Sequence, residues 1–257
     1  MATPGPEANH AALGMIAACE GVARGRPGAW RQSRPGLLAL MTTLLGRPYN
    51  GLYGLDNAGA SADAATLAAE LAASGVSWCA RLRPSTPVQV DAALHDCGLF
   101  EEDLIQLMAI FEMPHDPANT HSSMLQLRTC GPRDHDAIAS VLGAAFGTSP
   151  ASASMLLSPD HLLKGGTEWH LGEVDGVPVT CAMAVTAGDA IGIFAVGTVP
   201  DARGMGFGSA VTARAARHGL ARGLKLAVLT ASPEVQSVYE GIGFRVLESW
   251  RRLVPPQ

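Results

Sequence analysis

A glycine-rich stretch between residues 196 and 209 has the residue types and spacing of a phosphate-binding loop. Gly204, Gly206 and Gly208 alternate with other residues just before a segment with helical periodicity. Glycines let the backbone turn sharply and approach a ligand closely, and the amide groups at the start of a helix attract an anion. The stretch therefore predicts a site for a phosphate or pyrophosphate group.

Two common nucleotide motifs do not fit these glycines. The Walker loop needs a Lys directly after its glycines, and Lys164 and Lys225, the only lysines of the chain, are both elsewhere. The dinucleotide fingerprint GxGxxG has a different spacing and belongs to an early strand–helix–strand unit. From these residues alone, the remaining alternative is a glycine-rich turn that binds nothing.

A single tyrosine follows further along the chain. Ser232 and Pro233 are suited to begin a short helix, since Ser is a good N-cap and Pro fits the first turn. Tyr239 is the only tyrosine of the C-terminal half, and Gly243-Phe244 comes after it. A phenol is protonated at neutral pH and can donate to a leaving group that gains negative charge. The alternative is a partly buried core tyrosine on an amphipathic helix.

From about residue 124 to 254, these motifs and their order resemble the GNAT superfamily of N-acetyltransferases. Arg203, Gly206 and Gly208 form the pattern Arg-x-x-Gly-x-Gly, with Pro200 three residues before the arginine. The resemblance implies direct transfer of an acetyl group from acetyl-CoA to an amine in a ternary complex. It also implies an α/β (α+β) fold with a mixed, mostly antiparallel sheet flanked by helices.

The resemblance implies a role for each matching position. The backbone of residues 196–198 would pair with the pantetheine arm as an added strand does, and Tyr239 would protonate the departing thiolate. Ser232 stands where many relatives have an Asn that contacts the cofactor, and its hydroxyl can still make a hydrogen bond. The residues expected to bind acetyl-CoA are Val196, Gly197, Thr198, Arg203, Gly204, Met205, Gly206, Phe207, Gly208, Ser209 and Ser232.

No acidic residue stands where many family members have a Glu that accepts the proton of the amine. The strands expected at 190–199 and 224–230 contain neither Asp nor Glu. The alternatives to such a Glu are a water chain that removes the proton, a residue of the N-terminal half, or an amine that is already neutral. Candidate bases elsewhere in the C-terminal half are Glu168, His170, Asp189 and Glu234.

Alternating strands and helices are expected to position these residues in the C-terminal half. Period-2 and period-3.6 patterns distinguish the two kinds of element. The expected strands are 124–129, 168–174, 177–186, 190–199, 224–230 and 244–253. The expected helices are 132–146, 154–163, 206–222 and 233–241.

The N-terminal half repeats the end of this order more weakly, which indicates a smaller, degenerate GNAT-like domain at 1–112. Its expected strands are 37–43, 48–55, 76–82 and 104–111, and its expected helices are 60–74 and 88–97. A Pro-, His- and Ser-rich linker at 113–123 would join it to the catalytic domain at 124–257. The stretch 56–61 lacks Arg-x-x-Gly-x-Gly. Four residues of this half are suited to line a pocket, and the simpler alternative is that they are core aromatics and a turn asparagine. They are Trp30, Tyr49, Asn50 and Trp78.

Composition narrows the function classes. The 257 residues carry a net charge of -5 without a run of Lys or Arg, which argues against a nucleic-acid partner. Neither a signal peptide nor an apolar run of about 18 residues is present. Five scattered cysteines without a CxxC pair argue against a zinc site and favour a reducing compartment. We therefore expect a cytoplasmic enzyme, monomer or homodimer, that acts on a small-molecule amine without a metal or a membrane.

Two other functions stay open. Acetylation of a protein or peptide N-terminus needs an open groove for an extended backbone. A non-catalytic module would only bind acetyl-CoA, and the absence of an evident base keeps this alternative open. Turnover of an amine with acetyl-CoA would exclude the second.

Overall fold

The computed structural model describes residues 4–44, 46–117, 124–154 and 166–256, which form two compact units. Unit 1 comprises Met1–Leu107, Thr230–Pro233 and Val246–Gln257, and unit 2 comprises Met108–Leu229 and Glu234–Arg245. The linker expected at 113–123 lies partly outside the described residues, so the domain boundary stays a prediction. Among the described residues, no helix is long and apolar enough to cross a membrane.

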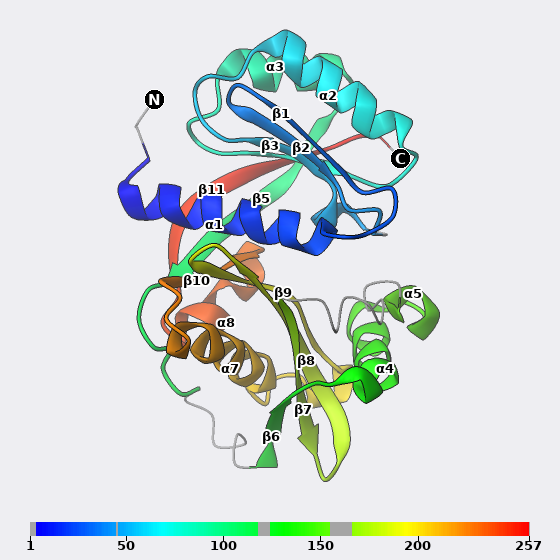
Figure 1. Cartoon of the computed structure of the whole chain (residues 1–257), viewed down its shortest axis with the longest axis vertical. Helices are drawn as coiled ribbons and strands as arrows, with labels where there is room; N and C mark the ends of the chain where they lie inside the picture. The colour runs from blue at the N-terminus through cyan, green and yellow to red at the C-terminus, as the bar shows by residue number, and fades with distance from the viewer. Residues whose placement is uncertain (1–3, 45, 118–123, 155–165, 257) are drawn as a thin grey trace. The chain divides into compact units, whose positions relative to one another are not determined.

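Unit 2 is built on a sheet in the order β5-β10-β9-β8-β7-β6 (Figure 1). Neighbouring strands from β6 to β9 are antiparallel, and β10 runs parallel to β9. The strands are β5 (Phe100–Ile110, of which the end belongs to this unit), β6 (Gln126–Thr129), β7 (Thr167–Val174), β8 (Val177–Ala187), β9 (Ala190–Thr198) and β10 (Leu226–Ala231). Asp175 and Gly176 both have positive φ, which gives the tight turn predicted between β7 and β8.

Two main helices cover opposite sides of this sheet, α4 (His135–Phe146) and α7 (Phe207–Ala221) (Figure 1). The face predicted for α4 is buried at Ile138, Val141 and Leu142, while Ala145 is half-buried. The remaining helical elements are α5 (Pro150–Ser154), α8 (Gln236–Glu240) and the short 3-10 turns Pro132–Asp134, Pro200–Ala202 and Pro233–Val235. The helix predicted at 154–163 lies outside the described residues from position 155 onward.

Unit 1 contains a second set of strands in the order β1-β2-β3-β4-β11-β5. β1 to β3 are antiparallel neighbours, β3 and β4 run parallel, and β11 pairs antiparallel with β4. The strands are β1 (Trp30–Arg34), β2 (Leu37–Met41), β3 (Gly51–Gly54), β4 (Cys79–Leu82) and β11 (Arg245–Val254), and the helices are α1 (Pro6–Ala23), α2 (Ser61–Ala73) and α3 (Val88–Asp96).

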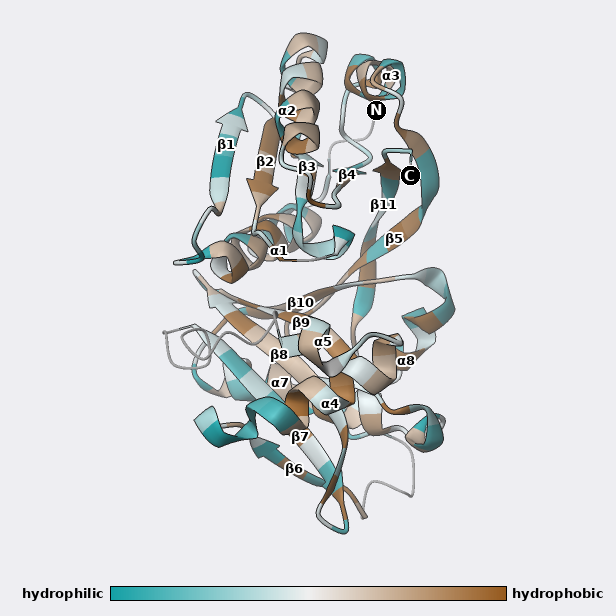
Figure 2. Cartoon of the chain, turned by 90° about the vertical axis from the view of Figure 1, so that its right-hand side faces the viewer, coloured by the Kyte–Doolittle hydropathy of each residue, from teal (hydrophilic) through white to brown (hydrophobic). Residues whose placement is uncertain are grey.

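The core of unit 1 lies between its sheet and the helix pair α2 and α3. Leu37, Ala39 and Met41 of β2 pack in one cluster with Leu67 and Leu71 of α2. All of β2 is buried, whereas β1 alternates between half-buried and exposed positions. Figure 2 shows this contrast, with a hydrophobic β2 beside a mainly hydrophilic β1. The sheet therefore ends at β1 with a polar edge, which is a common protection against pairing with another chain.

Three predictions for the N-terminal half were incomplete. The helix α1 and the strand β1 were not predicted. The strand expected at 48–55 is instead a 3-10 turn, Arg47–Tyr49, followed by β3. Pro48 fits the first turn of that helix. Asn50 follows the turn, and its buried side chain accepts a hydrogen bond from the Thr42 amide at 2.8 Å.

The C-terminal strand β11 is held in unit 1 by a buried ion pair. Arg83 donates two hydrogen bonds to Glu248, at 2.9 Å from Nε and 2.7 Å from Nη2. The indole of Trp250 donates to the same carboxylate at 2.6 Å. A bidentate pair of this kind fixes orientation as well as distance. The last strand of the C-terminal half of the sequence is thus an integral part of unit 1.

Candidate functional site

The strand before the glycine loop separates from its parallel neighbour. β9 pairs with β10 only from Ala190 to Gly192, although β9 continues to Thr198. Its register against β8 shifts next to Ala195, which has a φ of 49°. A β-bulge bends a strand and interrupts its pairing. Residues 196–198 therefore lie on the bent part of β9, beyond its pairing with β10, where a ligand can pair with the backbone.

Gly197 allows the helix α4 to pack closely on this segment. A Cβ atom at Gly197 would lie 3.0 Å from the Cβ of Ala145 and 3.5 Å from Phe146. On β8, the hydroxyl of Thr180 donates to the Gly197 carbonyl at 2.8 Å and lies 3.0 Å from the Thr198 hydroxyl. The segment 196–198 is therefore fixed by a helix and by a neighbouring strand.

The glycine loop ends at the first turn of α7. Gly204 and Gly206 have φ values of 77° and 78°, a conformation that L side chains adopt at a cost. Gly206 is the N-cap, and its carbonyl accepts the first helical bond from Ala210 at 3.0 Å. The first amides of a helix have no partners within it and carry the positive end of the helix dipole. The loop thus has the geometry of an anion site.

Arg203 connects the loop to α4. Its Nη2 donates to the carbonyl of Ala145 at 2.7 Å, and its Nε donates to that of Thr198 at 3.3 Å. A cation is favourable at the C-terminal end of a helix because the last carbonyl groups are unpaired there. In this arrangement Arg203 positions the loop and contributes positive charge near it, while its hydrogen bonds go to the protein backbone.

The helix α8 with Tyr239 is tied to the start of α7. The hydroxyl of Ser209 donates to the carbonyl of Val238 at 3.3 Å, directly before Tyr239. The half-buried Tyr239 ring meets Phe244 edge-on, with 6.3 Å between the centroids. Burial raises the pKa of Tyr239 to about 12. Its phenol is therefore protonated at any physiological pH and can act only as a proton donor.

The other expected binding residues have different surroundings. Phe207 is 2% exposed and packs into the core as the first residue of α7, so that only its backbone can face a ligand. Met205 is 37% exposed in the loop. Gly208 has room for a methyl group, since a Cβ there would lie 3.5 Å from the Thr198 hydroxyl. Ser232 is half-buried and belongs to unit 1, outside the group of residues that unit 2 brings together.

Three of the four candidate bases lie away from the glycine loop. Glu168 and His170 on β7 meet His218, which at 1.5 Å per residue is about 16 Å along α7 from Phe207. Burial lowers the pKa of His170 to about 4. Asp189 precedes β9 and is separated from Val196 by roughly 20 Å of strand. Glu234, the fourth candidate, is exposed in the 3-10 turn Pro233–Val235 before α8. The positions of the other three side chains supply no base at the glycine loop.

Unit 1 lacks the features that form the loop site in unit 2. β3 and β4 stay paired along the whole of Gly51–Gly54, so that these parallel strands do not separate. The following turn is closed by Asp56, which accepts a hydrogen bond from the Ala58 amide at 2.7 Å, and Gly59 has no positive φ. The turn after β3 therefore does not have the geometry of the glycine loop, and the origin of the N-terminal half as a degenerate duplicate stays a prediction.

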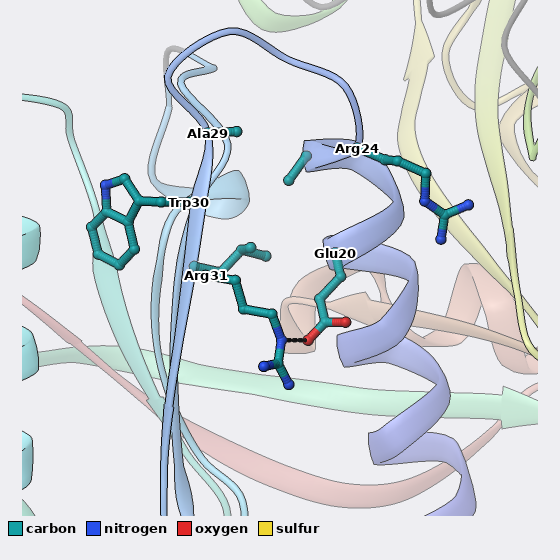
Figure 3. A pocket seen from close by; sticks show the side chains of 7 residues that line it. Glu20, Arg24, Ala29, Trp30 and Arg31 are labelled. Carbon is teal, nitrogen blue, oxygen red and sulfur yellow. Dashed lines mark hydrogen bonds and ion pairs between the residues drawn. The ribbon is translucent and has the colours of Figure 1, made fainter.

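The polar and aromatic residues of the N-terminal half have mainly structural surroundings. Asn50 bonds to the Leu44 carbonyl at 2.8 Å, and Trp78 is 3% exposed in the core. Trp30 lines a hollow of about 290 Å³ between α1 and β1, together with the ion pair of Glu20 and Arg31. Figure 3 shows the indole of Trp30 turned away from these charged groups, so it does not form an aromatic wall with them.

Known proteins share the fold and part of the sequence pattern. The family model described as FR47-like protein matches residues 171–253, which include β9, the glycine loop and α8. No curated protein sequence matches the chain. Several solved structures match 90% or more of the chain, and three of them represent the group. A GCN5-related N-acetyltransferase from Kribbella flavida has 20% sequence identity and a TM-score of 0.68, and the match covers 96% of each chain. A GCN5-related N-acetyltransferase from Sphaerobacter thermophilus has 19% identity and a TM-score of 0.57, over 98% of this chain and 94% of that one. A tandem GNAT protein from the clavulanic acid biosynthesis pathway has 13% identity and a TM-score of 0.59, over 92% of this chain and 86% of that one.

Identities of 20% and below show the fold of the chain and leave its substrate open. They confirm the predicted class, a mixed and mostly antiparallel sheet flanked by helices. Two of these structures are of proteins named as GCN5-related N-acetyltransferases, and the third is of a tandem GNAT protein. The family-model match over residues 171–253 and the shared fold agree with the predicted resemblance to the GNAT superfamily.

Proposed function

We propose that the chain transfers an acetyl group from acetyl-CoA to a primary amine of a small molecule. The observation that carries this proposal is the geometry of β9 and α7. A strand that bends away from its parallel neighbour at Ala195 leads into a loop with Gly204 and Gly206 in the left-handed conformation. The loop then opens onto the first amides of α7. These features fit an elongated ligand with amide groups at one end and a pyrophosphate at the other.

The cofactor would be bound mainly by backbone atoms. The peptide groups of residues 196–198 are suited to pair with the two amides of pantetheine. The amides of residues 207–209 are suited to receive the pyrophosphate oxygens, with the charge of Arg203 nearby. Ser232 is proposed as a further polar contact on the resemblance alone.

In the proposed reaction, the neutral amine nitrogen attacks the thioester carbonyl carbon, and a C–N bond forms. The C–S bond then breaks, and the thiolate takes the phenolic proton of Tyr239. The proton lost by the amine nitrogen passes to water, and the phenolate regains a proton from water. The balance is one amine and one acetyl-CoA converted into one amide and one free coenzyme A. The proposal assigns Tyr239 as proton donor because it is protonated and its helix adjoins the first turn of α7.

We further propose a tandem arrangement in which residues 1–112 are a degenerate partner of the catalytic part. The order β3, α2, β4, α3, with β3 and β4 parallel, matches the order β9, α7, β10, α8 of the catalytic part, in which β9 and β10 are parallel. The full-length match to a tandem GNAT protein supports this reading. We expect a cytoplasmic monomer or homodimer.

Binding and turnover of the purified chain test the proposal. Calorimetry measures coenzyme A binding, and a colorimetric thiol assay measures coenzyme A release with a panel of small amines and of peptides with free N-termini. Release with small amines supports the proposal, and release with peptides alone favours an N-terminal acetyltransferase. Binding without release from any amine identifies a non-catalytic module.

A matched pair of variants separates ligand approach from backbone strain. Gly206 needs a positive φ, so valine would strain the fold, whereas asparagine tolerates this conformation. Gly188→Asn is the control, since Gly188 has a φ of 60° and open space around its Cβ position. We expect Gly206→Asn to weaken coenzyme A binding by about 10-fold or more, equivalent to about 1.4 kcal/mol. Unchanged binding by folded Gly206→Asn would refute the assignment of the loop.

A further inference from the structure

Three side chains with metal-ligating atoms converge between β7 and the C-terminal half of α7. Glu168 and His170 are two residues apart on β7 and therefore point to the same face of the sheet. His218 meets them from α7. One ligand atom from each of the three residues lies within 4.8 Å of the other two.

The polar atoms of this cluster are buried and mostly without hydrogen bonds. His170 is fully buried, and neither of its ring nitrogens has a partner among the described residues. The rings of His170 and His218 are perpendicular, with 5.6 Å between their centroids. Nδ1 of His218 lies 2.8 Å from Oε2 of Glu168, but the geometry is not that of a hydrogen bond. Buried polar groups are normally paired, so a histidine without any partner needs an explanation.

We propose that Glu168, His170 and His218 bind a divalent transition-metal ion, with zinc as the preferred ion. Two imidazoles and one carboxylate are a known ligand set for zinc, with water in the fourth position of a tetrahedral site. An ion here pairs with the lone pair of His170 that no protein donor reaches. Harder ions such as Mg²⁺ and Ca²⁺ prefer sites made of oxygen alone.

The surrounding charges limit the strength of this site. Arg222 donates to Oε1 of Glu168 at 2.6 Å, which leaves Oε2 for the ion. Arg214, one turn before His218, is a second nearby cation. Both guanidinium groups oppose a divalent ion, although the Arg222 side chain is 52% exposed and therefore screened by solvent. We expect micromolar rather than nanomolar affinity for zinc.

The position of the site assigns it a structural role. It lies about 16 Å along α7 from the first turn, too far for the ion to contact a pyrophosphate bound at the glycine loop. An ion coordinated from both elements clamps α7 onto β7. Because α7 carries the phosphate-binding amides at its other end, the clamp stabilises the helix that positions the cofactor. The half-exposed ring of His218 provides a path for the ion to enter.

Metal titration of the full chain, without an affinity tag and treated with a chelator, tests this site. Calorimetry measures the affinity for Zn²⁺, Co²⁺ absorption reports tetrahedral coordination, and thermal melting reports stabilisation. The test variants are His218→Gln and Glu168→Gln, both at partly exposed positions. The control is His135→Gln, which removes another histidine beside a carboxylate in unit 2, with 3.2 Å between His135 and Asp136.

We expect wild type and His135→Gln to bind one zinc ion and to melt at a higher temperature with zinc. Each test variant should lose about 100-fold or more in affinity, because even outer partners of metal ligands contribute about 10- to 100-fold. Wild-type protein that binds no zinc at millimolar concentration would overturn the proposal. Equal binding by wild type and His218→Gln would also overturn it, since it would show adventitious surface binding only.

Discussion

Replacing Tyr239 with phenylalanine is the most direct test of the proposed chemistry. Tyr239→Phe keeps the ring, its half-buried position and its edge-on contact with Phe244 at 6.3 Å between centroids. It removes only the hydroxyl group. No hydrogen bond that anchors α8 depends on that hydroxyl, since the backbone of Tyr239 accepts those of Ile242 and Phe244 at 3.1 Å. The fold and the affinity for coenzyme A should therefore stay nearly unchanged.

The raised pKa of Tyr239 determines the pH range in which the hydroxyl can donate. With a pKa of about 12, only about one phenol in 10⁴ is ionised at pH 8. Because the pKa is raised, the donor is fully present below pH 10 and is lost only as the pH approaches 12. A rise in rate with pH between pH 6 and 10 must therefore come from loss of the ammonium proton or from another group.

The size of the effect follows from the step that the phenol serves. General acid catalysis contributes about 10²- to 10⁴-fold, so kcat should fall by that factor. KM for acetyl-CoA should change by less than about 2-fold, because the donated hydrogen bond strengthens only as charge develops on sulfur. Steady-state rates of coenzyme A release and single-turnover rates of amide formation measure the two quantities. Tyr49→Phe, at a half-buried tyrosine of unit 1, is the matched control.

Two results would refute this reasoning. The first is a Tyr239→Phe enzyme with the wild-type single-turnover rate, which would leave water or the substrate ammonium as the proton source. The second is a basic limb below pH 10 that disappears in the variant, because Tyr239 would then ionise far below the pKa of about 12 that its burial produces.

Three further predictions concern packing and stability. Gly197→Ala should destabilise the protein by about 1–3 kcal/mol in chemical denaturation, since its Cβ would lie 3.0 Å from that of Ala145, whereas Gly131→Ala, with open space, should change stability by less than about 0.5 kcal/mol. Arg83→Met should cost about 3–5 kcal/mol, because it leaves the buried Glu248 without its cation, and an unchanged denaturation midpoint would contradict this. A fragment of residues 120–257 should be poorly soluble by size-exclusion chromatography, because it contains β11 without the unit 1 partner strand β4, and a soluble monomer would disprove this dependence.

The C-terminal elements could be predicted within a few residues because their patterns are local. Asp175-Gly176 marked the β7–β8 turn, and Gly206 marked the start of α7. In contrast, α1 consists largely of Ala and other small residues, and both small and large residues are buried along it, so its pattern has no single apolar stripe. β1, WRQSR, is a polar edge strand with little apolar contrast.

Contacts between distant parts of the sequence could not be predicted in this way. The pairing of β11 with β4 depends on Arg83 and Glu248, which no spacing rule connects. The expectation of a metal-free protein rested on the absence of a CxxC pair, but His170 and His218 are brought together by the packing of α7 on β7. Strand and helix patterns show which face is buried and do not show which two faces meet.

The candidate cofactor site could be predicted in part because it depends on backbone geometry. The close packing of α4 requires a glycine at Gly197, and the positive φ angles require glycines at Gly204 and Gly206. These requirements can therefore be recognised in the sequence. An acceptor site depends instead on side chains that differ from one substrate to another, and no residue pattern of the chain identifies it.

The general base that accepts the amine proton also depends on side chains, and no residue pattern of the chain identifies it either. An acetyltransferase whose amine enters in the neutral form needs no carboxylate on β9 or β10, so the absence of one favours an acceptor that is less basic than a lysine side chain. Rates that rise among amines as the pKa of the ammonium falls would support this inference, and highest rates with strongly basic amines at neutral pH would contradict it.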